Sequence, residues 1–295
     1  MPTILLTGAT GFLGSHLLEA LLNRGHKVII LKRSISDCWR ISRLLDQVVS
    51  YDVDLKPLEL PFEQQPIDTV IHTACHYGRN GSDLNEIVET NLMFGLRLLD
   101  LSLVYNTGTF INTDTLLNKN LNVYSLSKGQ FVEWLKQSSN NIRVINLKLE
   151  HMYGGKDDIA KLAPWVLSQL KADQSEIKLT KGEQSRDFIY IDDVVHAYLT
   201  ILERVQDLAD YNEFDVGTGD LITVRHFIEE LKKAYEVEFG ITTTKLNFGI
   251  IPYREGEMMA VELNNQPLID LGWSVKSRLH DGLKKVISQL SQDLV

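Results

Sequence analysis

Short apolar runs alternate with amphipathic runs through the first half of the chain. Runs that fit buried strands lie at residues 4–6, 27–31, 48–54, 69–73, 109–112 and 143–149. Patterns with helical spacing lie at residues 13–23, 39–45, 83–104 and 123–137. Continuous apolar strands that alternate with helices predict an α/β fold with a doubly wound parallel sheet.

The pattern changes after Tyr153. An acid-rich loop, a helix near residues 163–170 and a strand at 176–180 predict a smaller C-terminal α/β lobe, which gives two domains, 1–152 and 153–295. One more strand is predicted at 211–217, and the domains would interleave if it rejoins the first sheet. Two X-Pro pairs, at Pro61 and Pro66, predict a loop ahead of the fourth strand.

Composition narrows the class of protein. The chain has 295 residues, 44% of them hydrophobic, with no run of about 18 apolar residues and no signal-like N-terminus, so we expect a cytoplasmic globular protein. Only Cys38 and Cys75 occur, which excludes a disulfide framework and a Cys-rich zinc site. A net charge of −9 argues against nucleic-acid or anionic membrane surfaces, so an anionic ligand would need local arginines and helix termini.

A glycine turn separates the first strand from the first helix. Gly8 suits the backbone angles of the turn, Gly11 allows close approach of a pyrophosphate, and Gly14 allows the helix to lie against the strand. The N–H groups at the helix start can then bind phosphate. We predict a dinucleotide site, with a purely structural turn as the alternative. The contacts expected from this turn are Gly8, Thr10, Gly11, Phe12, Leu13 and Gly14.

Basic residues end the second strand, where NAD sites usually carry an acidic residue. Lys32, Arg33 and the Ser34 hydroxyl can pair with a ribose 2′-phosphate, so the sequence predicts NADP(H); a solvated basic loop is the alternative. Asp52 and Val53 follow the third strand and are placed to meet the adenine edge.

Tyr124 and Lys128 form the chain's only Tyr-x-x-x-Lys pair. Side chains four residues apart share a helix face, and a nearby ammonium lowers the pKa of a phenol toward working pH. Thr113 adds a hydroxyl at the C-terminal end of the preceding strand, the edge at which such sheets bind ligands.

The chain resembles the extended short-chain dehydrogenase/reductase family that acts on nucleotide sugars, over nearly its full length. The matching segments are Thr7–Gly14, Asp52-Val53, Ile71–Ala74, Asn91, Thr113, Tyr124 with Lys128, Tyr153-Gly154, Arg186–Val194, Asp215–Gly219, Arg254–Glu257 and Leu271–Trp273. The resemblance implies a Rossmann-type cofactor domain, with Thr73 and Ala74 also at the cofactor, and a substrate-binding lobe.

The resemblance also implies roles for individual residues. Tyr124 would donate a proton to the sugar carbonyl, Thr113 would orient that oxygen, and Lys128 would hold the nicotinamide ribose. Arg186 and Arg254 would bind the diphosphate, unless each forms a structural ion pair instead. The substrate-site residues implied in this way are His76, Asp114, His151, Arg186 and Arg254. The helices at 83–104 and 123–137 would form a homodimer interface, although the sequence alone indicates only that they are buried.

Departures from the family pattern narrow the reaction. Family dehydratases carry Thr-Asp-Glu where this chain has Thr113-Asp114-Thr115, and epimerases usually carry an acidic residue in place of Lys32. Two segments, Leu149–Gly154 and Phe110–Thr115, together most resemble the CDP-abequose synthase type, which reduces the 4-keto group of a CDP-3,6-dideoxyhexose. We therefore expect an NADPH-dependent 4-ketoreductase of deoxysugar and surface-polysaccharide (O-antigen) biosynthesis.

Three alternatives remain open from the sequence. A nucleotide-sugar 4-epimerase is the enzymatic one, and a non-catalytic NADP sensor is disfavoured by Tyr124 and Lys128. His151 could contact the diphosphate or be a satisfied histidine. His72 and His76 lie at a strand end and its loop and cannot share a helix face, so no metal site is expected.

Overall fold

The computed structural model describes residues 2–78, 81–254 and 256–292. The chain divides into two compact units, each made of two segments. The first unit comprises Met1–Leu149 and Ala197–Asp215, and the second comprises Glu150–His196 and Val216–Val295. The two units are described separately below.

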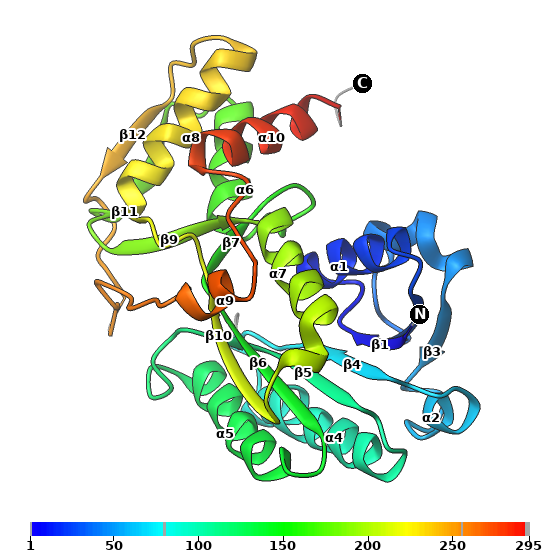
Figure 1. Ribbon diagram of the computed structural model, residues 1–295. Helices are drawn as coiled ribbons and strands as arrows, with labels where there is room; N and C mark the ends of the chain where they lie inside the picture. The colour runs from blue at the N-terminus through cyan, green and yellow to red at the C-terminus, as the bar shows by residue number, and fades with distance from the viewer. Residues whose placement is uncertain (1, 79–80, 255, 293–295) are drawn as a thin grey trace. The chain divides into compact units, whose positions relative to one another are not determined.

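A seven-stranded sheet forms the centre of the first unit (Figure 1). Its strand order is β10-β6-β5-β4-β1-β2-β3. The strands are β1 (Thr3–Thr7), β2 (Lys27–Lys32), β3 (Val49–Asp52), β4 (Thr69–His72), β5 (Thr109–Thr115), β6 (Arg143–Leu149) and β10 (Tyr211–Val216). Strands β1 to β6 pair in parallel, which confirms the predicted doubly wound sheet.

Helices cover both faces of this sheet. Figure 1 shows α4 (Phe94–Val104) and α5 (Val123–Ser138) on one face, and α1 (Phe12–Asn23) with the later part of α7 (Ile191–Arg204) on the other. The helix predicted at 83–104 consists of α3 (Leu84–Val88), a π-helical turn at Glu89–Met93 and α4. The predicted loop at residues 60–66 contains the short helix α2 (Leu60–Gln64), which tolerates Pro61 in its first turn. The helix predicted at 39–45 is a 3₁₀ helix at Trp39–Gln47.

The core between α4, α5 and the sheet is aromatic as well as aliphatic. Phe110 of β5 and Phe131 of α5 are fully buried, and their ring centroids lie 6.0 Å apart in an edge-to-face arrangement. A Cβ at Gly95 would approach the Phe131 ring to 2.8 Å, so α4 lies close to α5 at this point. This packing fixes α5, and with it Tyr124 and Lys128, against the strands.

The second unit holds two small sheets. One has the order β11-β9-β7 and the other pairs β12 with β8. The strands are β7 (His151–Tyr153), β8 (Glu176–Leu179), β9 (Ser185–Tyr190), β11 (Leu221–Thr223) and β12 (Lys245–Phe248), and the helices are α6 (Leu162–Lys171), the start of α7, α8 (Val224–Phe239), α9 (Gln266–Asp270) and α10 (Leu279–Gln292). Because β7 pairs with β9, the chain leaves the first unit at Leu149, ahead of the expected boundary after residue 152.

Two buried carboxylates anchor loops in the second unit. Asp187 of β9 accepts hydrogen bonds from the N–H groups of Thr218 and Gly219, at 2.8 and 2.6 Å, and from the Thr218 hydroxyl. Asp193 of α7 accepts the N–H groups of Lys276 and Ser277 at 2.8 and 2.9 Å. In each case the carboxylate takes the place of water as the hydrogen-bond acceptor of backbone N–H groups, which allows those groups to be buried.

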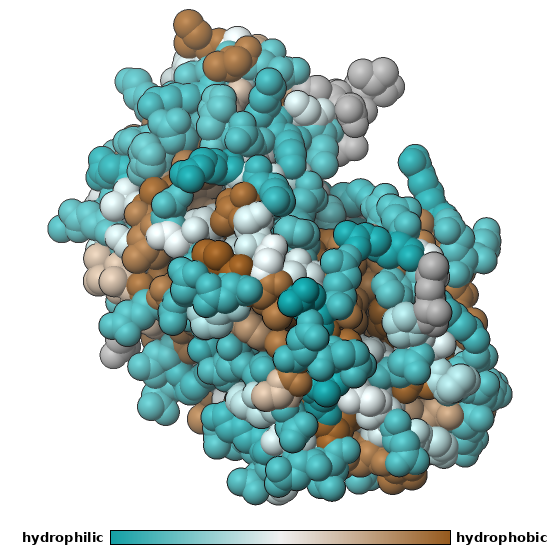
Figure 2. Space-filling model, in the orientation of Figure 1, coloured by the Kyte–Doolittle hydropathy of each residue, from teal (hydrophilic) through white to brown (hydrophobic). Residues whose placement is uncertain are grey.

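Hydrophilic residues cover most of the face seen in Figure 2, and hydrophobic residues appear in small groups among them. Over the described ranges, no helix has both the length and the apolar character needed to cross a membrane.

Candidate active site

The glycine turn between β1 and α1 leaves no room for side chains. Gly8 has a φ of +69°, and a Cβ there would lie 2.6 Å from Thr73 Oγ1 and 2.8 Å from the Ala74 nitrogen. A Cβ at Gly14 would overlap the carbonyl oxygen of Gly8. Helix α1 starts after Gly11, which offers no side-chain cap to the first N–H groups of the helix. These N–H groups and the bare turn fit the pyrophosphate of a dinucleotide.

Thr7 ties the end of β1 to the end of β4. Its hydroxyl oxygen accepts the N–H groups of Thr73 and Ala74, both at 3.2 Å, so its hydrogen is donated to His72 Nδ1 at 2.9 Å. The His72 ring is therefore neutral, with its proton on Nε2. That nitrogen has no hydrogen-bond partner in the described structure and lies among the rings of Phe94, Phe110 and Phe131. Burial, together with the charge of Lys128, lowers the His72 pKa to about 3, so His72 is a structural residue.

Acidic partners accompany the basic residues at the end of β2. Strands β2 and β3 pair Lys32 with Asp52, and the Asp52 carboxylate lies 3.5 Å from Lys32 Nζ and accepts the Ser34 hydroxyl at 2.9 Å. The Ser34 N–H is donated to Asp54 at 2.8 Å. Asp52 therefore pairs with Lys32, and the Arg33 side chain is exposed. Arg40 donates to the Thr10 carbonyl oxygen at 3.3 Å, which adds a cation beside the glycine turn.

The predicted catalytic residues lie on β5 and α5. Thr113 is half-buried near the end of β5, and Tyr124 is half-buried in the first turn of α5, with its ring 5.2 Å from that of Tyr77. Asn122 and Ser125 form a capping box that starts α5 just ahead of Tyr124. Lys128 is 1% exposed, and burial lowers its pKa from the usual value, while Cys75 and Asp114 oppose this shift.

Asp114 points away from its neighbour Thr113. Successive strand residues face opposite sides of a sheet, and both Asp114 carboxylate oxygens accept hydrogen bonds from Lys119 Nζ, at 2.7 and 2.8 Å. Lys119 also donates to the Thr115 carbonyl oxygen at 2.8 Å. Thr113 instead bonds to Tyr198 of α7 at 2.6 Å. The predicted substrate residue Asp114 is thus held in an ion pair on the other face.

Asn91 fixes the loop after β4 to α5. Its side-chain oxygen accepts the His76 N–H at 2.7 Å, and its amide donates to the His76 carbonyl oxygen and to Ser127 Oγ, at 2.9 and 3.1 Å. Asn91 is fully buried in the π-helical turn. The loop that carries His76 is therefore held beside the first turns of α5.

The other predicted substrate residues belong to the second unit. Arg186 is buried and pairs with Glu257 at 2.7 Å, while Arg254 is exposed and its carbonyl oxygen accepts the Glu257 N–H. His151 is exposed and its Nδ1 bonds to the buried carboxylate of Glu150. Arg186 thus forms an ion pair, as its structural alternative predicts, and His151 has a hydrogen-bond partner, as expected of a satisfied histidine.

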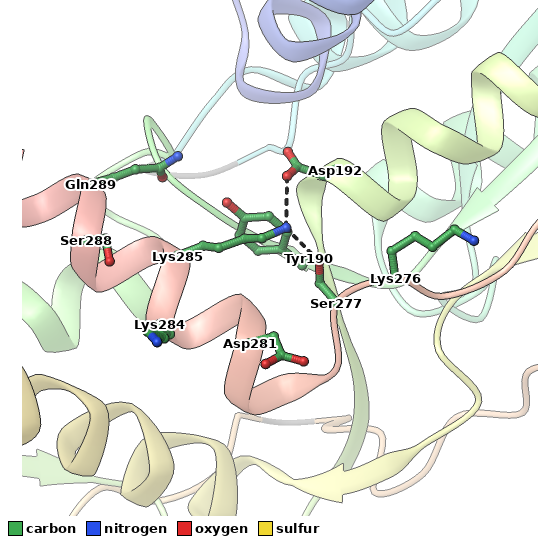
Figure 3. A pocket seen from close by; sticks show the side chains of 9 residues that line it. All are labelled: Tyr190, Asp192, Lys276, Ser277, Asp281, Lys284, Lys285, Ser288 and Gln289. Carbon is green, nitrogen blue, oxygen red and sulfur yellow. Dashed lines mark hydrogen bonds and ion pairs between the residues drawn. The ribbon is translucent and has the colours of Figure 1, made fainter.

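A pocket of about 650 Å³ in the second unit contains none of the predicted site residues. Figure 3 shows Lys285 of α10 above the Tyr190 ring, where its ammonium bonds to Ser277 Oγ at 2.9 Å and approaches Asp192 to 3.4 Å. Burial raises the pKa of Tyr190 to about 12.

Comparison with known proteins identifies the family to which the chain belongs. Residues 4–217 match the model of the NAD dependent epimerase/dehydratase family. The chain belongs to this family. It is 35% identical to a CDP-abequose synthase from Salmonella muenchen, over 97% of either chain, and 34% identical to one from Salmonella typhimurium, over 97% of this chain and 98% of the other.

Solved structures of two nucleotide-sugar epimerases have the same Rossmann-type fold. A UDP-glucose 4-epimerase from Thermotoga maritima, solved with UDP-glucose, gives a TM-score of 0.86 at 23% identity and covers 99% of this chain and 100% of its own. A UDP-glucuronic acid 4-epimerase from Bacillus cereus, solved with UDP-glucuronic acid and NAD, gives 0.83 at 23% identity, over 98% and 99% of the two chains. These similarities support the fold alone.

Sequence reasoning missed Lys119, Arg40 and Tyr198. Lys119 follows Asp114 by five residues, and Arg40 follows the basic end of β2, so charge near a predicted site was the available signal. Tyr198 lies at an apolar helix position 85 residues from Thr113, and no local pattern marks it.

Proposed function

We propose that the protein reduces the C4 ketone of a nucleotide-linked deoxyhexose, of the CDP-4-dehydro-3,6-dideoxyhexose type, with NADPH. The observation that carries this proposal is a catalytic set of Thr113, Tyr124 and Lys128 within one unit of a chain 35% identical to CDP-abequose synthase. The relative supplies the substrate class, and the residue set supplies the chemistry of carbonyl reduction.

The cofactor would be held by the glycine turn, the β2 end and Lys128. When bound, a reduced nicotinamide supplies the hydride for C4. Tyr124 donates its phenolic proton to the carbonyl oxygen, and the buried Lys128 ammonium stabilises the phenolate that remains. The Thr113 hydroxyl holds the same oxygen by a hydrogen bond. Together these residues supply charge stabilisation that is in place before the reaction.

The ion pair of Asp114 supports reduction over dehydration. Elimination of water needs an acid for the leaving hydroxyl and a base for the adjacent carbon. Both Asp114 oxygens are engaged by the Lys119 ammonium, and Thr115 offers a hydroxyl where dehydratases carry a carboxylate. Among the described residues, Asp114 and Thr115 at this end of β5 do not form the acid–base pair that water loss requires.

In the substrate unit, we propose that Arg254 and His151 contact the diphosphate and that Arg186 lines the same site. The Glu257 carboxylate pairs with the Arg186 side chain, and the Glu257 N–H bonds to the Arg254 carbonyl oxygen, so one residue positions both arginines.

We also propose a cytoplasmic homodimer. Exposed apolar side chains on the π-helical turn, α4 and α5 would be buried in such an interface; they are Met93, Val104, Val123, Leu126 and Trp134.

Mass spectrometry of the products tests the reaction. Incubated with NADPH and a 4-keto nucleotide sugar, the protein should form a product about two mass units heavier, because a hydride and a proton are added. Reactions without NADPH are the control. A product about 18 units lighter than an intact NDP-hexose would contradict the proposal, and interconversion of 4-epimers with tightly held NAD would establish the epimerase instead.

Cofactor choice is a separate prediction, which rests on Arg33. NADP(H) should bind at least about tenfold more tightly than NAD(H), because a charge-assisted contact with the 2′-phosphate contributes about 1.5 to 3 kcal/mol. Arg33→Ala should remove this preference in fluorescence titrations and leave NAD(H) binding unchanged. Asp52→Asn should strengthen NADP(H) binding, since it frees Lys32 and Ser34 from a carboxylate.

The control for this titration is Arg97→Ala, which removes a cation that pairs with Glu89 on the α4 side of the unit. Its affinities should match those of the wild type. Equal affinities of the wild type for the two cofactors would rule out the NADP(H) assignment.

A further inference from the structure

The hydroxyl of Tyr198 is the only described group bonded to the side chain of Thr113. Tyr198 lies on α7, is fully buried, and places its oxygen 2.6 Å from Thr113 Oγ1. Both residues belong to the first unit. Among the buried residues nearest to it on the same helix, Ala197, Leu199 and Ile201 are apolar and Thr200 is polar. Packing alone would accept a phenylalanine at position 198, so the hydroxyl calls for a separate explanation.

The direction of this hydrogen bond follows from burial. A phenol hydrogen left without an acceptor in the interior costs about 1 to 3 kcal/mol, and within residues 2–78, 81–254 and 256–292 Thr113 Oγ1 is the acceptor available to it. Burial also raises the pKa of Tyr198 above its usual value, so the phenol keeps its proton. Tyr198 is therefore the donor and Thr113 Oγ1 the acceptor.

The donor role of Tyr198 determines what Thr113 can do. A threonine hydroxyl has one hydrogen and two acceptor lone pairs, and one lone pair is now taken. The hydrogen of Thr113 must point to a different partner. The bond from Tyr198 fixes the position of Oγ1 and restricts its hydrogen to directions away from Tyr198.

We propose that Tyr198 is a positioning residue that fixes the Thr113 hydroxyl as a donor to the carbonyl oxygen of the sugar. This inference rests on the proposed function, in which Thr113 orients that oxygen. A hydroxyl that accepts one hydrogen bond also donates a stronger one, so Tyr198 strengthens the contact as well as directing it. Tyr198 does not supply the reaction's proton, because no described group would replace it.

The test is a double-mutant cycle on kcat. Tyr198→Phe keeps the ring and removes the hydroxyl, and it should lower kcat about tenfold with KM and the NADPH dissociation constant unchanged. Thr113→Val should lower kcat about 100-fold, and adding Tyr198→Phe to it should cause no further loss. Thr113→Ser keeps a hydroxyl, so in that background the effect of Tyr198→Phe should return.

Tyr51→Phe is the matched control, since it removes another mostly buried phenol whose partner is Gln64, at 2.8 Å, and it should leave kcat unchanged. Thermal melting of each variant shows whether it folds. Multiplicative losses in the double variant, equal losses of kcat and NADPH affinity, or an unchanged kcat in Tyr198→Phe would each overturn the inference.

Failure of the proposed function gives a different result. A wild type that oxidises no NADPH with 4-keto nucleotide sugars refutes ketoreduction, and the cycle is then run on the rate of 4-epimerisation, which also places a carbonyl oxygen at Thr113. A wild type active in reduction with an unaffected Tyr198→Phe refutes only the role of Tyr198. A wild type inactive in both reactions refutes both.

Discussion

The Tyr124→Phe variant is expected to lose about 10²- to 10⁴-fold in turnover, the usual contribution of a positioned general acid. Cofactor and substrate dissociation constants should stay within about twofold of the wild type, because only one oxygen atom is removed and the ring contact with Tyr77 is kept. Steady-state kinetics of NADPH oxidation and fluorescence titration measure the two quantities.

The matched control is Tyr105→Phe, a partly exposed phenol at the end of α4. Its turnover should equal that of the wild type. Near-full turnover in Tyr124→Phe would assign the proton to a different residue.

The second large effect concerns folding of the second unit. Asp187→Ala should lower the free energy of unfolding by about 3 kcal/mol or more, because it leaves the N–H groups of Thr218 and Gly219 and the Thr218 hydroxyl without their buried acceptor. Urea denaturation followed by circular dichroism measures this loss. Asp220→Ala, which removes an exposed carboxylate 3.5 Å from Arg278, is the control and should change stability little. A loss as small as that of the control would mean that water satisfies the freed donors.

Local patterns in the sequence predicted most elements of the first unit. The glycine turn, the strand–helix alternation and the spacing of Tyr124 and Lys128 all depend on residues within about one helix turn of each other, so pattern alone suffices. The interruption of the helix at residues 89–93 could not be predicted in this way. There the buried Asn91 bonds to His76 and Ser127, and these partners come together only in the folded chain.

The electrostatics of the site also depend on long-range pairing. Lys32 and Ser34 look like free ligands for a phosphate in the sequence, yet the β2–β3 register brings Asp52 onto both. Asp114 looks like a substrate residue because it follows Thr113, but strand alternation turns it toward Lys119. Residue type and position in the sequence indicated the region of the proposed site. Strand register and the face of the sheet on which a side chain lies determined which of its groups are free to bind a ligand.

The discontinuity of both units has a consequence for how the chain folds. Strand β10 is the edge strand beside β6 and is synthesised after the first segment of the second unit, so the seven-stranded sheet cannot be complete until about residue 216 has left the ribosome. Until then β6 is an unpaired edge that could pair with another chain. A fragment ending at Leu149 would keep that edge permanently, so neither unit can be expressed as a contiguous piece of the gene without losing part of its own structure.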